Sequence, residues 1–425
     1  MSVTERLKNA LGNIPLEPFK PITLDLIGHY NTHQLTRDIS AGLTVGMVAL
    51  PLAMAFAIAS GVAPEAGIYT SIIAGFLIAV LGGCRVQIGG PAGAFIVIIY
   101  GIIANYGLAN LMIATIGSGI LLFLTGLLKV GNLIRFTPVS IVIGFTIGIA
   151  VLIALSQVKD FLGLNIDKVP ADFFGQMSAY AANIHTVNWY ALGVALVSFV
   201  IVKFWPKDTG FRTAAWKRWI AKIPGTVVVL VVSTIAVTAL NLPVETIGSK
   251  FGGIPQNLPS LQMPDFDLAN LRNLIGPMVT LALLGAIESL LCARVADAMT
   301  DDRHNPNQEL MGQGIANFVV PFFGGIPATG TIARTVTNIK SGATSPISGV
   351  VHAITLLVVI LVAAPLASNI PLAALSAILL FVASNMGNWG EFIRLRRMTM
   401  SYKATLLLTF FLTVVTFLQH QVLFM

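Results

Sequence analysis

Apolar segments alternate with short polar stretches along most of the chain. A helix needs about 20 residues to cross a bilayer, and we distinguish 13 segments, two of them short and interrupted by Gly and Pro. They begin near Ala41, Ala66, Ala92, Leu111, Phe136, Trp189, Gly225, Gly276, Glu309, Thr331, Ile347, Leu372 and Tyr402. The pattern predicts an all-α, polytopic membrane protein.

The composition fits a chain whose main solvent is lipid. Hydrophobic residues make up 56% of the sequence and charged residues 10%, whereas a soluble protein carries about 25% charged residues. The net charge of +7 would also suit a nucleic-acid-binding protein, but Lys and Arg gather in alternate loops, as on the cytoplasmic side of a membrane protein. We therefore predict a lipid bilayer as partner, no nucleic acid, and a cytoplasmic N-terminus.

Two segments are interrupted by similar sequences. GGPAGAF begins at Gly89 and GGIPATGT begins at Gly324, so that their Pro-Ala pairs correspond at an offset of 236 residues. Backbone that is not helical at bilayer depth must be buried in protein or line a wet cavity, because an unpaired N–H or C=O facing lipid costs several kcal/mol. Each break therefore marks a candidate site.

The offset extends to other segments and suggests an internal repeat. Short, Gly/Pro-interrupted segments at corresponding places in two halves are typical of transporters built from inverted repeats. We predict a cytoplasmic N-terminal segment at 1–37, a first repeat at 38–240, an extracytoplasmic loop at 241–275 and a second repeat at 276–425. The second repeat lacks a counterpart of the seventh segment, so we expect that its last helix is missing, either by truncation or for another reason.

The second break has the features of an anion receptor. A half-helix that begins near Thr331 would direct its free N–H groups and the positive end of its dipole into the protein. Arg334 would add positive charge one turn away, unless it extends to the cytoplasmic surface instead.

Glu288 is the leading candidate for a coupling residue. It lies in the middle of an apolar run, where a charged carboxylate costs at least roughly 2.5 to 3.5 kcal/mol. The side chain must therefore bind a proton, lie beside a cation such as Arg334, or form a hydrogen bond across a helix interface. Cys292 shares its helical face and could line the same cavity, although a buried cysteine is more often plain packing.

Other residues are less decisive. Pro51 predicts a kink, and Phe56 could present its electropositive ring edge to an anion or face lipid. His352 is a lone histidine in an apolar helix, where we expect its hydrogen bonds to be satisfied. The two cysteines show no metal-ligand spacing, and the chain has no nucleophile elbow or P-loop. We predict no enzyme, no metal and no cofactor.

Several long motifs resemble the sulfate permease (SulP) family of anion transporters, in particular its bacterial C4-dicarboxylic acid transporter branch. The most specific are ALPLAMAFAIASGVAPEAGIYT from Ala49, GGPAGAF from Gly89, PVSIVIGFTIGI from Pro138, LLGAIESLLCARVADAMT from Leu283 and FFGGIPATGTIARTVTNIKSGATSPISG from Phe322. The resemblance implies two inverted seven-helix repeats divided into a core and a gate domain, with half-helices at segments 3 and 10. It covers nearly all of the chain from Arg37 to Leu418.

The resemblance also implies a site between the two half-helices. Its anion-binding positions fall on Phe56, Ala92, Gly93, Ala94, Phe95, Gly330, Thr331, Ile332, Ala333 and Arg334. Its coupling carboxylate falls on Glu288, and the cavity around it would be lined by Leu52, Ser289 and Cys292. In sodium-coupled bicarbonate members the corresponding residues resemble an Asp with a Thr one turn later, so that Glu288 with Cys292 favours a proton over sodium as the coupling ion.

The function that follows is uptake of a small anion across a bacterial inner (plasma) membrane. We expect a C4-dicarboxylate such as succinate, fumarate or aspartate, carried by proton symport. The alternatives are sodium-coupled transport of bicarbonate or sulfate, and a passive anion channel. Family members usually carry a cytoplasmic STAS domain, which this sequence lacks, and a homodimer is possible.

Overall fold

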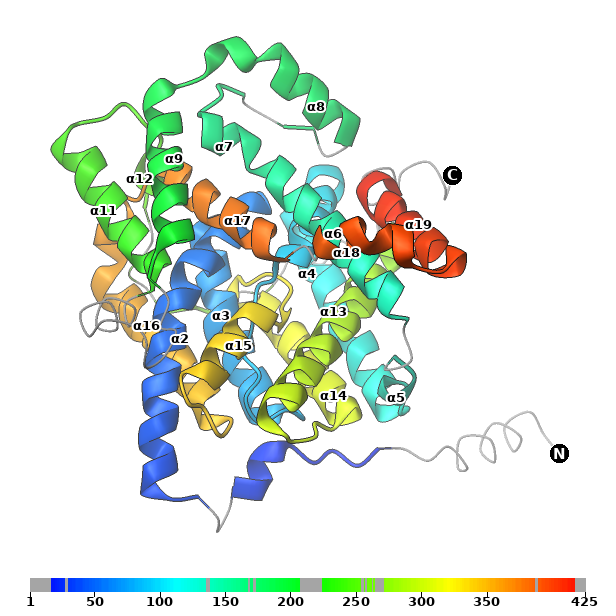
Figure 1. The fold of residues 1–425 in the computed structure, drawn as a ribbon. Helices are drawn as coiled ribbons and strands as arrows, with labels where there is room; N and C mark the ends of the chain where they lie inside the picture. Colours follow the sequence, from blue (N-terminus) through cyan, green and yellow to red (C-terminus); the bar gives the residue numbers. More distant parts are fainter. Residues whose placement is uncertain are drawn as a thin grey trace.

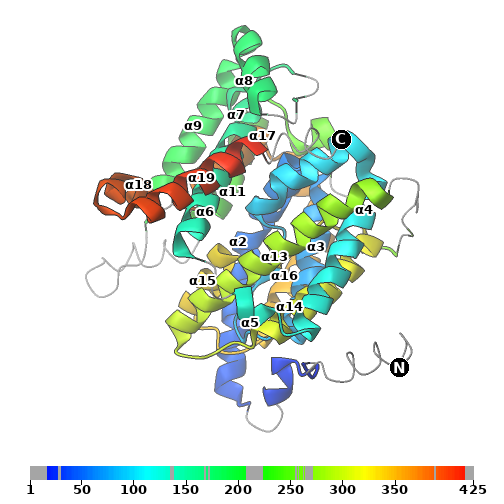
Figure 2. The same ribbon diagram turned by 90° about the vertical axis from the view of Figure 1, so that its right-hand side faces the viewer.

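The structure is a computed structural model that describes residues 17–26, 30–134, 138–166, 169–170, 173–206, 224–253, 256, 258–261, 263, 271–386 and 389–416. In this part of the chain nearly all regular structure is helical, and the strands β1 (Gly89–Gly90) and β2 (Thr329–Gly330) have two residues each. Figures 1 and 2 show that the helices form two bundles, which we call the core domain and the gate domain. The predicted all-α fold is confirmed.

The core domain contains both strands and the helices that pack around them. Its members are α2 (Thr32–Ala59), α3 (Pro64–Leu81), η2 (Gly93–Phe95), α4 (Ile96–Leu127), α13 (Leu271–Thr300), α14 (Pro306–Val319), η5 (Val320–Phe323), α15 (Ile332–Lys340) and α16 (Ile347–Ala367). Their order in the chain shows that each half of the sequence supplies half of the domain. At the end that carries the N-terminus, η1 (Ile22–Leu26) and α5 (Gly131–Ile134) lie beside it (Figure 1).

The gate domain also draws on both halves of the chain. Its members are α6 (Val139–Ser156), α7 (Val158–Leu162), α8 (Phe173–Ala182), η3 (Ile184–Thr186), α9 (Trp189–Phe204), α11 (Gly225–Ala239), α12 (Ile247–Phe251), α17 (Leu372–Met386), α18 (Trp389–Arg394), η6 (Leu395–Arg397) and α19 (Met400–Thr416). Helix α17 packs against α6, α7 and α9, and α19 packs along α6. The extracytoplasmic loop predicted at 241–275 contains the short helix α12, and the short helices α7 and α8 lie between α6 and α9.

The helix contacts show the internal symmetry that the two predicted repeats imply. Helix α2 packs on α16, and its counterpart α13 packs on α4. Likewise the contact of α14 with α4 corresponds to that of α3 with α16, and the contact of α19 with α6 corresponds to that of α17 with α9. Equivalent pairs across two repeats support a two-fold relation between the halves.

Every predicted apolar segment has a helix at or beside its expected start. By length and composition, five helices of the described part could cross a membrane, and five shorter apolar ones accompany them. The first helix begins at Thr32, before the expected start near Ala41, because Asn31 and Gln34 form a capping box there. Segments 3 and 4 run on as α4, in which Gly107 has non-helical angles of φ 84° and ψ 172°. Glycine adopts this positive φ without a steric penalty.

The two breaks lie against each other at the centre of the core domain. β1 and β2 pair in antiparallel register, with Gly89 opposite Gly330 and Gly90 opposite Thr329. This contact joins one repeat to the other through backbone hydrogen bonds. The sequence predicted two breaks but not their pairing.

Close helix packing in the core domain depends on glycine. A Cβ placed on Gly119 of α4 would lie 2.6 Å from the Phe318 nitrogen and 2.7 Å from the Gly314 oxygen of α14. These distances are shorter than a van der Waals contact, so the two backbones touch directly. Small residues at such contacts are common where helices associate in a membrane.

We expect Gly119→Ala to destabilise the protein by about 1 to 3 kcal/mol, because the added methyl group must push α14 away. The matched control is Gly101→Ala in the same helix, where an added Cβ meets no atom within 4 Å. Thermal unfolding of the two variants in detergent measures the difference. Equal unfolding temperatures would contradict the direct contact.

A buried carboxylate fastens the start of α2 to the turn before α16. Asp38 is 0% exposed, and its Oδ1 accepts hydrogen bonds from the nitrogens of Thr344 (2.6 Å) and Ser345 (3.2 Å). Its Oδ2 accepts from the Tyr30 hydroxyl (2.8 Å) and the Ser345 hydroxyl (2.5 Å). Burial and the bond to Asp38 raise the pKa of Tyr30 to about 12, so the phenol remains a donor at neutral pH.

We expect Asp38→Asn to cost about 1 to 3 kcal/mol, because the amide group would place a donor against donors and leave a buried partner unsatisfied. Asp302→Asn is the control, since Asp302 is part-exposed, pairs with the part-exposed Arg85 at 3.0 Å and accepts a hydrogen bond from the neighbouring Arg303 nitrogen. Ion pairs near the surface contribute about 0 to 1 kcal/mol. Unfolding midpoints of both variants test this. A loss no larger in Asp38→Asn than in Asp302→Asn would show that the cluster is not stabilising.

Candidate functional site

The pairing of the breaks fixes the beginning of α15. The Ile88 oxygen accepts hydrogen bonds from the Thr331 nitrogen (2.9 Å) and from the Thr331 hydroxyl (3.0 Å). In return the Ile88 nitrogen donates to the Thr335 hydroxyl at 3.0 Å. Ile88 therefore fixes the first turn of α15 through both its C=O, which bonds to Thr331, and its N–H, which bonds to Thr335.

These hydrogen bonds determine which backbone N–H groups of α15 remain free to bind an anion. The Thr331 N–H, which we expected to bind the anion, is already used by Ile88. The first helical N–H bond within α15 runs from Thr335 to the Thr331 oxygen, so Ile332, Ala333 and Arg334 have no acceptor inside the helix. Ile332 is 43% exposed, and Ala333 is exposed as well.

In the first repeat the half-helix begins with η2 at Gly93, and side chains cover this N-terminus. A Cβ placed on Gly93 would lie 2.7 Å from Cδ1 of Ile153 and 3.4 Å from Cε1 of Phe56. Phe56 is 6% exposed, so it faces the start of η2 and not lipid. Since Ile153 belongs to α6, a gate-domain side chain closes this end of the site.

The neighbours of Gly93 are equally buried. Ala92 is 6% exposed, Ala94 2% and Phe95 1%. They share one apolar cluster with Leu52, which is 5% exposed. Leu52 therefore packs inside the core domain, beside the start of η2.

Arg334 points into the core domain. The side chain is 1% exposed, which excludes the extension to the surface that the sequence left open. Its Nη1 donates to the Ser71 hydroxyl at 3.2 Å and lies 2.3 Å from where a Cβ on Gly90 would be. Its Nε and Nη2 have no hydrogen-bond partner in the described part of the chain. The guanidinium thus contributes positive charge from behind the β1–β2 pair.

His352 of α16 is buried near this pair. It is 0% exposed and would be 3.6 Å from a Cβ on Gly75 of α3. Neither ring nitrogen has a hydrogen-bond partner among the residues that the structure describes. The expectation of a satisfied histidine is therefore wrong.

Glu288 on α13 is partly buried. Its Oε2 is buried and bonds to no described residue. Because the free atoms of Arg334 are also without partners, the possible pairing of the two charges is not formed. An unpaired carboxylate inside an apolar helix is suited to bind a proton.

The two residues expected to line a cavity beside Glu288 are buried. Ser289 is 0% exposed and donates to a carboxylate oxygen of Glu309 at 3.1 Å. Cys292 is 0% exposed, and its thiol lies 3.1 Å from the Thr335 hydroxyl. Both residues join α13 to neighbouring parts of the core domain.

The sequence analysis missed Glu309 and Gln87. Glu309 is 0% exposed and accepts hydrogen bonds from three side chains and one backbone nitrogen. A signal was present, because Glu309, Gln313 and Asn317 follow each other at i, i+4 spacing in an apolar segment. Such a polar stripe on one helical face indicates a buried network.

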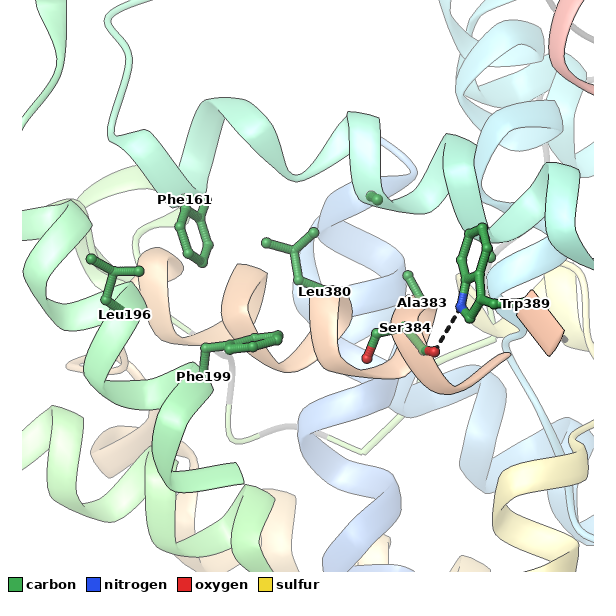
Figure 3. Close-up of a pocket in the computed structure, with 9 residues that line it drawn as sticks. Phe161, Leu196, Phe199, Leu380, Ala383, Ser384 and Trp389 are labelled. Atoms are coloured by element: carbon green, nitrogen blue, oxygen red, sulfur yellow. Dashed lines mark hydrogen bonds between the residues drawn. The ribbon is translucent and has the colours of Figure 1, made fainter. Parts of the chain in front are cut away.

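A separate crevice lies in the gate domain and holds no charge. It has a volume of about 410 Å³ and is lined by Ala150, Ala154, Phe161, Leu196, Phe199, Leu380, Ala383, Ser384 and Trp389. Figure 3 shows its aromatic and aliphatic side chains, with the Trp389 ring nitrogen bonded to the Ser384 oxygen at 2.9 Å. Without a charged or free polar group it is no anion site.

No group of three His, Cys, Asp or Glu side chains with the geometry of a metal site occurs among the described residues. The groups that the structure places at the site are the helix N–H groups, the buried guanidinium of Arg334 and the carboxylate of Glu288, with the thiol of Cys292 one turn after Glu288.

Comparison with known proteins finds relatives along most of the chain. The model of the Sulfate permease family matches residues 35–409. YvdB of Bacillus subtilis, named as a candidate sulfate transporter, is 46% identical over 386 residues, which are 91% of this chain and 71% of YvdB. The bicarbonate transporter BicA of Picosynechococcus sp. is 32% identical over 362 residues, which are 83% of this chain and 62% of BicA.

Solved structures show the same fold. The transmembrane domain of a cyanobacterial BicA superposes with a TM-score of 0.82 at 32% identity, covering 92% of this chain and 98% of that one. SLC26A9 superposes with a TM-score of 0.80 at 18% identity, and the match covers 98% of this chain and 67% of the SLC26A9 chain. At this identity the likeness supports the fold alone. The match of the family model over most of the chain shows that this protein is a membrane protein of the sulfate permease family of anion transporters.

Proposed function

We propose that the protein is a secondary active transporter that takes up a small inorganic oxyanion, sulfate or bicarbonate. The observation that carries this proposal is the pairing of β1 with β2, which holds two half-helix N-termini together inside the core domain. The free N–H groups of α15 and the positive end of its dipole favour a bound anion. Arg334 strengthens this field from behind.

Sulfate and bicarbonate are preferred over a C4-dicarboxylate because YvdB and BicA, which resemble this chain over most of its length, are named for these inorganic anions. The helix N–H groups recognise charge and not a carbon skeleton, so the site itself fits all three anions. The dicarboxylate prediction made from the sequence thus becomes the alternative.

Coupling is assigned to a proton on Glu288. The carboxylate lies in the core domain with a buried oxygen that no described cation neutralises. Ionising it there without a partner is costly, so binding of a proton from one side and its release to the other can be linked to movement of the anion. The nearby thiol of Cys292 makes a sodium site less favourable.

The domain structure fits alternating access. The anion-binding elements belong to the core domain, whereas Ile153, which covers Gly93, belongs to the gate domain. A rigid-body movement between the domains would uncover that end. We place the N-terminus on the cytoplasmic side, in accord with the distribution of Lys and Arg.

Uptake into proteoliposomes tests the substrate and the coupling ion. Radiolabelled sulfate, bicarbonate and succinate are each supplied under an imposed pH gradient and, separately, under a sodium gradient. We expect concentrative uptake of an inorganic anion driven by the pH gradient. Uptake of succinate alone would restore the dicarboxylate alternative, and dependence on sodium would refute the proton on Glu288.

We predict that Glu288→Gln abolishes concentrative uptake while anion exchange continues, because the amide cannot release a proton. Glu245→Gln is the control, since Glu245 lies outside the helices and is 65% exposed. Accumulation ratios and counterflow rates are compared in the same vesicles. A variant that still accumulates anion against its gradient would exclude Glu288 as the coupling residue.

A further inference from the structure

The polar network around Glu309 lies directly behind the proposed anion site. Its Oε1 accepts hydrogen bonds from Nε2 of Gln87 (2.9 Å), Oγ of Ser289 (3.1 Å) and Nε2 of Gln313 (2.9 Å). Its Oε2 accepts from the Gly83 nitrogen at 2.8 Å. All four donors are neutral, and the carboxylate is fully buried.

Gln87 connects this network to the second break. Its side chain is 3% exposed, and a Cβ placed on Gly330 would lie only 1.8 Å from its Nε2. Gln87 therefore fills the space that the glycine leaves free in β2. The residue after it, Ile88, makes the bonds that hold Thr331 at the start of α15.

Ser289 connects the same network to the coupling helix. Gln87 divides its amide group between Glu309 and Ser289, with the second bond at 3.1 Å. Ser289 is the neighbour of Glu288 in the sequence. Glu309 thus bonds to Gln87, whose neighbour Ile88 holds the start of α15, and to Ser289, which is the neighbour of Glu288. One carboxylate is in this way linked to both parts of the site.

We propose that Glu309 is a positioning residue that sets the location of the anion-binding N–H groups of α15 relative to Glu288. This role rests on the proposed function, because it deepens the same site. Glu309 does not touch the anion. It acts through Gln87, whose amide hydrogens must face the carboxylate so that Ile88 and Gly330 keep their places.

The donor and acceptor pattern requires a carboxylate at residue 309. An ionised carboxylate only accepts hydrogen bonds and can satisfy four donors. A glutamine there has the same shape but only one acceptor oxygen, so it cannot accept from all four donors. Its NH2 group would face either the three side-chain donors, Gln87 among them, or the Gly83 N–H. In both orientations a donor opposes a donor, and the segment from Gly83 to Gln87, which leads to the anion site, is displaced.

The test is a swap of the two side chains. Glu309→Gln should raise the KM for the transported anion by about tenfold, because a mispaired donor in the buried network displaces Gln87 and with it the start of α15. Turnover at saturating anion should fall much less. The double variant Gln87→Glu with Glu309→Gln restores one donor facing one carboxylate, so its KM should return toward that of the wild type.

Gln308→Ala is the matched control. Gln308 is the neighbour of Glu309, is also 0% exposed, and bonds to the Lys20 nitrogen (2.8 Å) and the Leu81 oxygen (2.6 Å), away from the breaks. We expect it to lower thermal stability without changing KM. If Glu309→Gln does not fold, Gln87→Leu, which removes only the amide, should show the same rise in KM.

Hydrogen exchange gives a readout that does not depend on transport. Exchange of the Thr331 amide, which bonds to Ile88, should become faster in Glu309→Gln, return in the swap, and remain slow in Gln308→Ala. If this pattern appears in a protein that transports none of the tested anions, the positioning role holds and the proposed function fails. An unchanged KM and unchanged exchange in folded Glu309→Gln, or a swap without rescue, would overturn the positioning role.

Discussion

The structure depends on how the broken backbone at the centre of the core domain finds hydrogen-bond partners. Because no water is available in the hydrocarbon region, each unpaired N–H or C=O costs several kcal/mol. The β1–β2 pair supplies part of the bonds. Asn317 supplies two more, one to each polar group of Ala328 at 2.8 Å, and Thr70 does the same for Ile326 at 2.7 and 3.2 Å. These polar residues of apolar helices therefore supply hydrogen bonds to the backbone of the break.

This demand also decides which groups remain for an anion. The Thr331 N–H stabilises the break through Ile88 and is not available to a ligand. The next N–H groups of α15 lack acceptors because of their position in the helix, and Arg334 lies behind them with two unpaired nitrogens. A site of this kind attracts negative charge through fixed dipoles that need no rearrangement, while the side chains around it are apolar.

Much of the fold could be predicted from the sequence, since apolar length predicts helices and the repeated Gly-Pro motif predicts two breaks at equivalent places. The pairing of β1 with β2 could not, because strands of two residues leave no period to detect. Leu52, Ser289 and Cys292, which we expect to line a cavity, are all buried. Spacing shows which residues share a helical face and not what covers that face. Glu309 was missed because a glutamate near the start of an apolar segment resembles a residue at the membrane surface.

The division of bonds between the domains limits what can move. The side-chain hydrogen bonds that hold the two breaks together come from α3, α13, α14 and α15, which all belong to the core domain. Among the described residues, the gate domain contributes apolar contacts there, such as that of Ile153 with Gly93. Apolar surfaces slide without losing directional bonds, whereas the polar network would have to break bond by bond. The movement that breaks the fewest hydrogen bonds is therefore one in which the core domain shifts as a unit. The geometry of the proposed anion site is then kept, while the gate-domain side chains that cover it change.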